Sequence, residues 1–348
     1  MNKKVTIQDI ADALGISRNT VSKAINNSDG LAEATREKIL QKAIEMGYKQ
    51  FSYVADLMNS SMEAEKENTS EAAGEIALLT PAILRGNHFA SLFLDKFHRE
   101  IAQLGYTMGI YRITLDELQK KKLPALFDIT RIKAIVCVEV FDNDYADMLC
   151  ETEVPVLFVD APCRAGRKYL QADILLMDNT SEIMYFIHEA AARGLTKIGF
   201  IGEYTHCQSF FERYCAFRNA MMMENLPVDE KYIIRYRGKD VLDLADIIEP
   251  MEDLPELFIC ANDFFAIDAM QILAQKDRKL LKKCRFLGFD DTHESRIFYP
   301  SLSTVHIHTQ AMAYSAISLL VTRIKEPSMD VRTAHVACDL VLRDSTEF

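Results

Sequence analysis

The stretch VTIQDIADALGISRNTVSKAIN, residues 5–26, decides how the amino-terminal part of this chain folds. Thr6, followed three residues later by Asp9, has the spacing of a helix capping box. An apolar face then recurs at helical spacing on Ile7, Ile10, Ala11 and Leu14. Gly15 is suited to end this helix, and Ser17 is a good N-cap for a second one. The pattern predicts two short helices joined by a tight glycine turn.

The second predicted helix has an apolar side and a polar side. Val21, Ala24 and Ile25 form the apolar side. The polar side carries Arg18, Asn19, Ser22, Lys23 and Asn26. Arginine and lysine donate to guanine, and asparagine pairs with adenine, so this side has the chemistry of a reader of DNA bases. A third helix is predicted over about 33–46. A plain three-helix bundle is the alternative, and it needs no particular polar residues at these positions.

Charge is distributed unevenly along the chain. Residues 1–60 hold eight Lys/Arg and seven Asp/Glu, a net of 8 − 7 = +1, whereas the whole chain carries −11. The remainder therefore carries −12. A near-neutral head on an acidic body keeps the body away from phosphates and leaves the head to approach nucleic acid.

Composition places the chain among ordinary globular proteins. It has 348 residues, 49% hydrophobic and 26% charged, enough for two or three compact units. We expect a cytoplasmic protein with no membrane association, because no apolar run approaches the roughly 18 residues of a spanning helix and no secretory signal opens the chain. The eight cysteines are scattered, so we expect buried thiols and no metal site. His206, Cys207 and Cys215 are the nearest alternative as zinc ligands.

Beyond a polar linker at 59–75, short apolar runs alternate with amphipathic segments. GEIALLTP, PVLFVDAP, TKIGFIGE and PELFICAND are examples of these runs. Runs that are apolar on both faces and followed by helices are typical of parallel strands in βαβ units. The runs end in polar residues, namely Thr80, Asp160, Asn262, Asp263, Asp290 and Asp291. Ligands bind outside the carboxyl ends of such strands, so we expect a polar site there, although each residue alone is also suited to cap a helix or turn.

The sequence weighs against two other classes of function. No GxGxxG or GxxxxGK[ST] motif follows a strand, which argues against a nucleotide site, and we expect no cofactor. An enzyme would draw on the Asp290-Asp291 pair, but no nucleophile or metal arrangement accompanies it. A sugar-binding protein without regulatory output would share the body but has no use for residues 1–48.

The motifs VTIxDIA, G[VI]SxxTVSxxxN, TREKI and a closing GY resemble the DNA-binding head of the lactose/galactose repressor family of bacterial transcription regulators. The body resembles the same family in PVLFVD, LTKIGFIG, FICANDFFAIDAM, FLGFDD, YPSLSTV and LVLRDST. The matches run over nearly the whole chain in the family's order.

This resemblance implies a small all-α helix-turn-helix head on an α/β body. The head would span 1–48 and a hinge and linker 49–75. The body, 76–348, would be two doubly wound parallel-sheet lobes like those of periplasmic sugar-binding proteins. Its first lobe would comprise about 76–161 and 303–325, and its second about 164–300 and 328–346. The resemblance further implies a homodimer that acts as a repressor on near-palindromic operator DNA and is controlled by a small effector of carbohydrate type between the lobes.

The resemblance also assigns roles within the head. The base-contacting positions are Arg18, Asn19 and Lys23, and Lys23 stands where the family usually has arginine. The positions that contact the DNA backbone are Thr6, Ser17, Thr20, Ser22, Asn26 and Tyr48. Leu57 stands at the position of a minor-groove wedge. Before it, Gln50-Phe51 replaces the usual Pro-Asn start of the hinge helix.

The resemblance assigns effector-binding roles in both lobes. Arg213 and Asp263 match residues that usually hold effector hydroxyl groups, and Asn262 and Asp290 lie in the same motifs. Asn87, His88 and Phe89 match a loop that often lines the first lobe's side of the pocket. Phe141 and Asp160, at strand ends, complete the predicted set. The alternatives are an ion pair on a helix surface for Arg213 and a turn cap for Asp290. His306 and His308 are expected to be structural.

Overall fold

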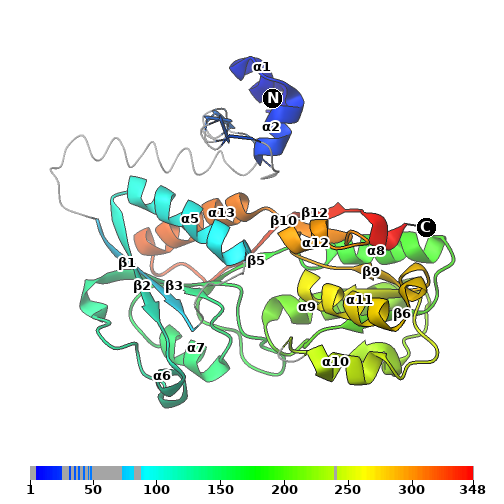
Figure 1. Cartoon of the computed structure of the whole chain (residues 1–348). Helices are drawn as coiled ribbons and strands as arrows, with labels where there is room; N and C mark the ends of the chain where they lie inside the picture. The colour runs from blue at the N-terminus through cyan, green and yellow to red at the C-terminus, as the bar shows by residue number, and fades with distance from the viewer. Residues whose placement is uncertain are drawn as a thin grey trace. The chain divides into compact units, whose positions relative to one another are not determined.

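The computed structural model describes residues 5–25, 31–32, 35–36, 38–39, 42–43, 46, 48, 73–81, 88–238 and 241–347, with the backbone alone for 88–92. The chain divides into two compact units (Figure 1). Unit 1 comprises Met1–Asp160, Leu170–Leu175 and His308–Val336. Unit 2 comprises Ala161–Tyr169, Leu176–Ile307 and Ala337–Phe348.

The amino-terminal head begins with helices α1 (Ile7–Leu14) and α2 (Arg18–Ile25). The predicted capping box is confirmed, because the Thr6 hydroxyl accepts from the Asp9 backbone N–H and the Asp9 carboxylate accepts from the Thr6 N–H at 2.7 Å. Gly15 follows α1 in the left-handed region, at φ 66°, where only a residue without a Cβ is unstrained. The predicted helix, glycine turn and helix are therefore present.

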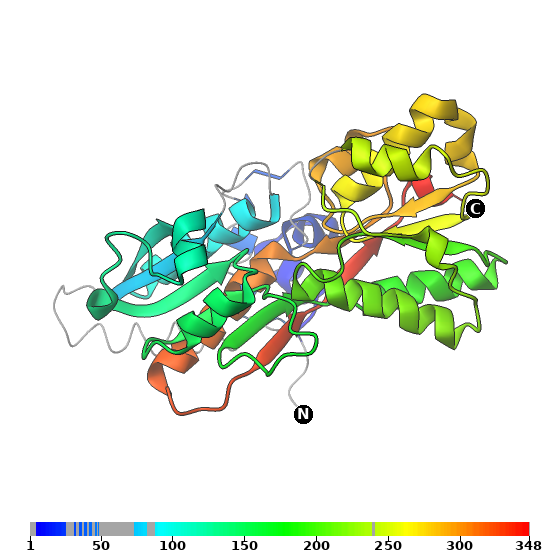
Figure 2. The ribbon, with the colours of Figure 1, turned by 90° about the horizontal axis from the view of Figure 1, so that it is seen from below.

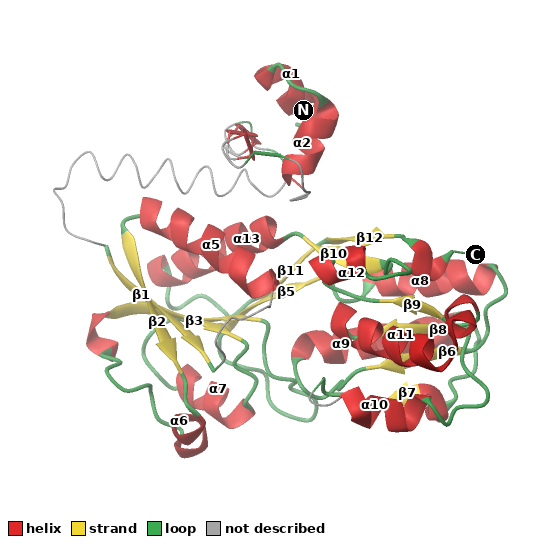
Figure 3. Ribbon diagram, viewed as in Figure 1, coloured by secondary structure: helices red, strands yellow, loops and turns green. Residues whose placement is uncertain are grey.

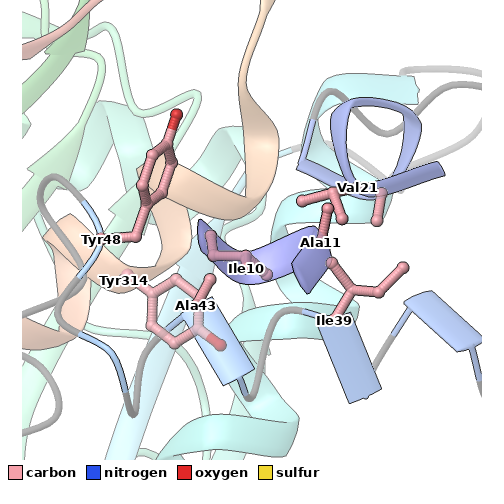
Figure 4. Packing of buried hydrophobic residues seen from close by; sticks show 8 residues of the cluster. Ile10, Ala11, Val21, Ile39, Ala43, Tyr48 and Tyr314 are labelled. Carbon is pink, nitrogen blue, oxygen red and sulfur yellow. The ribbon is translucent and has the colours of Figure 1, made fainter. Parts of the chain in front are cut away.

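A small apolar core holds the head together. Its buried side chains from the head are Ile10, Ala11, Val21, Ala24, Ile39, Ala43 and Tyr48, and most of them are labelled in Figure 4. Ile39 and Ala43 belong to the predicted third helix, whose described residues between 35 and 43 are helical. The periodic apolar positions of three segments thus converge on one another, as their spacing predicts.

Unit 1 contains a doubly wound sheet. Its elements are β1 (Gly74–Thr80), α5 (His88–Gln103), β2 (Tyr106–Arg112), α6 (Leu115–Lys120), β3 (Ile132–Val138), α7 (Asn143–Cys150), β4 (Val156–Val159), β5 (Asp173–Met177), α13 (Thr309–Lys325) and β11 (Thr333–Val336), with a 3-10 turn at Ile129–Arg131. The strand order is β11-β5-β4-β3-β1-β2, and the β1–β2, β1–β3, β3–β4 and β4–β5 pairs are parallel. Helices α5 and α13 lie on one face and α6 and α7 on the other (Figure 1).

Unit 2 repeats this plan. Its elements are α8 (Ser181–Ala192), β6 (Ile198–Ile201), α9 (Gln208–Met223), β7 (Ile233–Ile234), α10 (Val241–Ile248), β8 (Leu257–Cys260), α11 (Asp263–Asp277), β9 (Arg285–Leu287), α12 (His293–Ile297), β10 (Thr304–Ile307) and β12 (Cys338–Val341), with 3-10 turns at Glu230–Tyr232, Arg278–Lys282 and Asp344–Thr346. The parallel sheet has the order β7-β6-β8-β9. Helices α8 and α9 lie on one face and α10 and α11 on the other (Figures 2 and 3).

The predicted α/β fold class is confirmed by these sheets. Strands β4, β5, β6 and β8 are buried along their whole length, because helices cover both faces of each parallel sheet. None of the helices described is long and apolar enough to cross a membrane.

The chain crosses between units at positions that differ from the expected ones. Residues 303–307, expected in the first lobe, belong to unit 2, because β10 pairs antiparallel with β12. Residues 328–336, expected in the second lobe, belong to unit 1. The buried carboxylate of Asp173 holds them there: it accepts from Arg323 on α13 at 3.0 and 3.1 Å and from the Arg332 backbone N–H at 2.8 Å.

Candidate functional site

Helix α2 presents a polar surface at its first turns. Arg18, Asn19 and Lys23 are exposed, whereas Val21 and Ala24 on the opposite side are fully buried. Because the apolar side is fixed in the head core, the three polar side chains must point away from it. The helix therefore offers two cations and an amide together to a partner outside the head.

The N-terminus of α2 is capped as the sequence predicts. The Ser17 hydroxyl oxygen accepts from the Thr20 backbone N–H at 3.1 Å and lies 2.7 Å from the Thr20 hydroxyl. Ser22 is half-buried, and Thr6 is exposed with its hydroxyl donating to Asp9 at 2.6 Å. Of the hydroxyl groups predicted to face phosphates, those of Ser17 and Thr20 thus lie at the end of α2 where backbone N–H groups and the helix dipole attract anions.

Arg36 is a residue of this site to which the sequence reasoning gave no role. Its side chain is buried, and Nη1 donates to the carbonyl oxygens of Lys23 and Ala24, each at 3.3 Å. A cation on the last carbonyls of a helix offsets its negative end. Arg36 therefore positions the end of α2 that carries Lys23. The TREKI motif contains this residue, but no local spacing reveals that it reaches back to another helix.

Three further residues, Asn26, Tyr48 and Leu57, were predicted to contact DNA. Asn26 and Leu57 lie outside the described residues. Tyr48 is 3% exposed and its ring belongs to the head core, so any contact with DNA would fall to its hydroxyl group. Those contacts remain predictions.

In unit 2, Arg213 lies at the centre of a buried polar cluster. Its Nε donates to Asn179 Oδ1 at 2.9 Å, and its Nη1 donates to the Ala261 carbonyl at 2.5 Å. Nη1 also lies 3.7 Å from Asp290 Oδ1, and the guanidinium stacks on the Phe289 ring at 3.5 Å. The side chain is 3% exposed. Arg213 is thus not a member of a helix-surface ion pair but a buried cation that joins segments following β5, β8 and β9.

Asp263 is completely buried and engaged by its neighbours. Oδ2 accepts from the Thr292 N–H at 2.8 Å and from its hydroxyl, while Oδ1 accepts from the Thr304 hydroxyl at 2.5 Å. Burial, and then the nearby charge of Asp290, raise the pKa of Asp263 to about 8. In this arrangement Asp263 ties α11 to α12 and β10, and a direct contact with an effector remains a prediction that the burial does not support.

Two further predicted residues lie beside this cluster. Asn262 caps α11, its Oδ1 accepting from the Phe265 N–H at 2.9 Å. Asp290 has a positive φ of 113° and a partly exposed side chain. Its backbone can therefore form a turn while its side chain stays accessible to a ligand. The structure therefore brings Arg213, Asn262, Asp263 and Asp290 together in one region of unit 2.

The other predicted effector residues belong to unit 1. Phe141 follows β3 and Asp160 follows β4, the latter at a positive φ of 57°. Asn87 lies outside the described residues, and His88 and Phe89 begin α5, where the backbone alone is described. Their part in a ligand site stays a prediction.

A pocket of about 730 Å³ opens at the carboxyl ends of the unit 2 strands. From β6 the chain passes first to β7 on one side and then to β8 on the other, so the order of connection switches between β6 and β8. Doubly wound sheets bind ligands at such a switch point. The pocket is lined by Glu203, Thr205, His206, Phe210, Arg237, Gly238, Val241, Asn262, Phe264, Phe265 and Asp268. Asn262 alone among these was predicted. The sequence did not reveal the other lining residues, because β7 is only two residues long and the loop after β6 has no distinctive composition.

Glu203 organises one wall of this pocket. It is 5% exposed and accepts from the Thr205 hydroxyl at 2.6 Å, from Arg235 Nη2 at 2.7 Å and from Arg237 Nε at 3.0 Å. Burial would raise the pKa of Glu203, but the hydrogen bonds from Thr205, Arg235 and Arg237 outweigh it and lower the pKa to about 2. The carboxylate is therefore ionised at every physiological pH.

This lowered pKa predicts a component of acid sensitivity that Glu203→Gln removes. An ordinary glutamate in the unfolded chain titrates near pKa ~4.3, so the folded state gains stability from Glu203 above that pH and loses it as the pH falls towards 2. Melting temperatures of both proteins between pH 5 and about 2.5 test this. The gap between wild type and variant should narrow as the pH falls, and a constant gap would contradict the assignment.

The described residues contain no group of three His, Cys, Asp or Glu side chains placed to hold a metal ion. Cys207 is buried at the start of α9, where its backbone forms an isolated antiparallel β-bridge with Pro162. The polar clusters of unit 2 are therefore described by hydrogen bonds and ion pairs between protein groups.

Comparison with known proteins agrees with this arrangement of head and body. Residues 6–50 match the family model described as bacterial regulatory proteins, lacI family, and residues 187–346 match the periplasmic binding protein-like domain. The HTH-type transcriptional repressor PurR of Vibrio vulnificus is 26% identical over 352 residues, which cover 98% of each chain. The chain thus combines a lacI-family head with a periplasmic binding protein-like domain. PurR of Vibrio cholerae is 27% identical with the same coverage.

Solved structures of transcription regulators share the fold of this chain. A complex of the transcriptional regulator CelR with cellobiose aligns with a TM-score of 0.67 at 19% identity, covering 98% of this chain and 100% of that one. The lac repressor dimer bound to operator and the anti-inducer ONPF aligns with a TM-score of 0.64 at 17% identity, covering 99% of each chain. The fold of a small helical head on an α/β body is thus common to all three.

Proposed function

We propose that this chain is a sequence-specific repressor that binds a near-palindromic operator as a homodimer. The observation that carries this proposal is the exposed set Arg18, Asn19 and Lys23 on a short helix whose opposite side is locked in the head core. Two cations and an amide at neighbouring positions of one helix match the donors that read guanine and adenine in the major groove. The repressor names of the PurR relatives support the same direction of control.

We assign the remaining DNA contacts by position. The hydroxyl groups of Thr6, Ser17, Thr20 and Ser22 are proposed to bind backbone phosphates, together with Asn26 and Tyr48. Ser17 and Thr20 support this role, since they lie at the positive end of α2. These contacts set the register of the head and leave base choice to Arg18, Asn19 and Lys23.

We also propose that a small effector controls operator affinity. Its support is the pocket at the switch point of unit 2, which combines aromatic side chains with the polar groups Asn262, Arg237 and Asp268. Arg213, Asp290, Phe141, Asp160 and the 87–89 segment complete the proposed effector set, and Asp263 supports it indirectly through Thr292 and Thr304. A carbohydrate is proposed because the CelR structure contains cellobiose. An effector shifts operator affinity only by the difference in its affinity for the two states of the protein.

Selection of a binding sequence from random duplex DNA tests the regulator itself. The full chain should enrich a two-fold symmetric site, and its affinity should fall steeply as salt rises, because phosphate contacts release counterions. A thermal-shift screen of sugars and sugar derivatives then tests the effector, since a ligand of the folded state raises the melting temperature. No enriched site, or binding insensitive to salt, would reject the DNA-binding proposal.

Leu57→Ala is predicted to weaken operator binding and reduce DNA bending. The reason is positional: Leu57 stands where a leucine wedge opens a minor-groove step and lets more protein contact the bent duplex. Binding and bending are measured on the selected site with wild type and variant. Unchanged affinity together with unchanged bending would remove Leu57 from the interface.

A further inference from the structure

The cluster of Glu203, Arg235 and Arg237, of which Glu203 and Arg237 line the unit 2 pocket, carries more positive than negative charge. One buried carboxylate holds two guanidinium groups, those of Arg235 and Arg237. The group of three therefore has a net charge of about +1. Because Glu203 is also bonded by Thr205, its negative charge is fully committed inside the protein.

Arg237 is fixed at one end and available at the other. Among the described residues its hydrogen-bond partner is Glu203, to which Nε donates at 3.0 Å, and its side chain is 63% exposed at the pocket. The two terminal nitrogens thus keep their N–H donors for a ligand. A guanidinium held through Nε presents a planar pair of donors, the geometry that recognises a carboxylate or phosphate through two parallel hydrogen bonds.

Other pocket residues suit a ligand with hydroxyl groups. Asp268 Oδ2 accepts from the Tyr236 hydroxyl at 2.9 Å, and no described residue engages Oδ1. That oxygen is an acceptor for a ligand hydroxyl. Phe210 and Phe265 meet edge to face at 5.8 Å and give the pocket an apolar surface against which the carbon face of a sugar can pack.

From this arrangement we infer that the effector is a small polyhydroxylated acid, whose carboxylate or phosphate group pairs with Arg237. The inference rests on the proposed effector control and gives it a chemical class. Glu203 acts as a positioning residue, because its Oε2 holds Arg237 through Nε, while Arg235 bonds the other oxygen of Glu203. Neither residue needs to touch the ligand. Asp268 accepts a hydroxyl group of the same ligand.

Binding of matched ligand pairs to the full chain tests the inference. The probes are hexose 6-phosphates and hexuronates, each measured by calorimetry beside its neutral hexose, with inorganic phosphate as a further arm. At least one acid should bind about tenfold or more tightly than its neutral parent, as expected for a charge-assisted bidentate pair. The phosphate and uronate arms distinguish the two sources of the acidic group.

Substitutions locate the effect. Arg237→Gln should lower affinity for the acid about tenfold or more and leave affinity for the neutral hexose unchanged. Arg218→Gln is the matched control, since Arg218 is an exposed arginine of the same unit that pairs with Glu230 and does not line the pocket. Its affinity for the acid should equal that of wild type. Unchanged melting temperatures without ligand verify that both variants are folded.

Three outcomes overturn the inference: no acid binds, a neutral hexose binds as tightly as its acid, or Arg237→Gln leaves acid binding unchanged. Operator binding measured with and without each probe separates these outcomes from failure of the proposed function. If a neutral hexose changes operator affinity, effector control stands and the acidic ligand is rejected. If acids bind through Arg237 without changing operator affinity, the ligand class stands and the control is rejected.

Discussion

Replacing Arg18 with alanine is expected to weaken operator binding by about 1–3 kcal/mol, roughly 5- to 150-fold, and to relax base preference at one position of each half-site. Arg18 is an exposed residue in the first turn of α2 and has no core role to lose. Its removal therefore subtracts a base contact and leaves the head folded. Titration of the selected operator, and of operators changed at single base pairs, measures both effects.

Lys38→Ala is the matched control for this prediction. Lys38 is an exposed cation in the described part of the third head segment, so the variant removes the same charge outside α2. It should weaken all sequences by a similar factor or not at all, because a phosphate contact carries no base information. If Arg18→Ala loses affinity uniformly across operators while keeping every base preference, Arg18 contacts phosphate and the base assignment is wrong.

Arg213→Ala is expected to destabilise unit 2 by about 3–5 kcal/mol, the usual cost of removing one partner from a buried charged cluster. The variant removes a donor to Asn179 Oδ1 and to the Ala261 carbonyl, and it removes a cation that lies 3.7 Å from Asp290 Oδ1. It also empties the space beneath the Phe289 ring. A lowering of the melting temperature by about 6–20 °C follows for a unit of this size.

Arg218→Ala on the same helix is the control for Arg213→Ala. Arg218 is 40% exposed and pairs with Glu230 at the surface, where an ion pair contributes about 0–1 kcal/mol. A shift of at most a few degrees is expected for it. Equal shifts for the two variants would mean that the buried cluster does not stabilise unit 2.

The head was predictable from sequence to the level of single caps. Thr6, Asp9, Gly15 and Ser17 act through bonds within four residues, so their spacing is enough to reveal them. The role of Arg36 could not be predicted in this way. Its partners, the carbonyls of Lys23 and Ala24, lie 13 and 12 residues away, and no periodic pattern connects them.

The body was predictable in class but less so in its site. Apolar runs followed by helices identify parallel strands, because a strand buried on both faces cannot alternate with polar residues. Where the chain passes from one unit to the other depends on long-range contacts. These are the pairing of β10 with β12 and the bonds of Asp173 to α13 and Arg332. Such long-range partners are not encoded in the local pattern of either segment.

The sequence by itself therefore determined the helices of the head, the α/β class of the body, the family and the polar surface of α2. The tertiary structure alone decided that Arg213 and Asp263 are buried anchors and that Glu203 joins Arg235 to Arg237 at the unit 2 pocket. The physical reason is the range of the interactions. Capping and periodicity act within a few residues, whereas a pocket at a switch point is assembled from strand ends that only the completed sheet brings together.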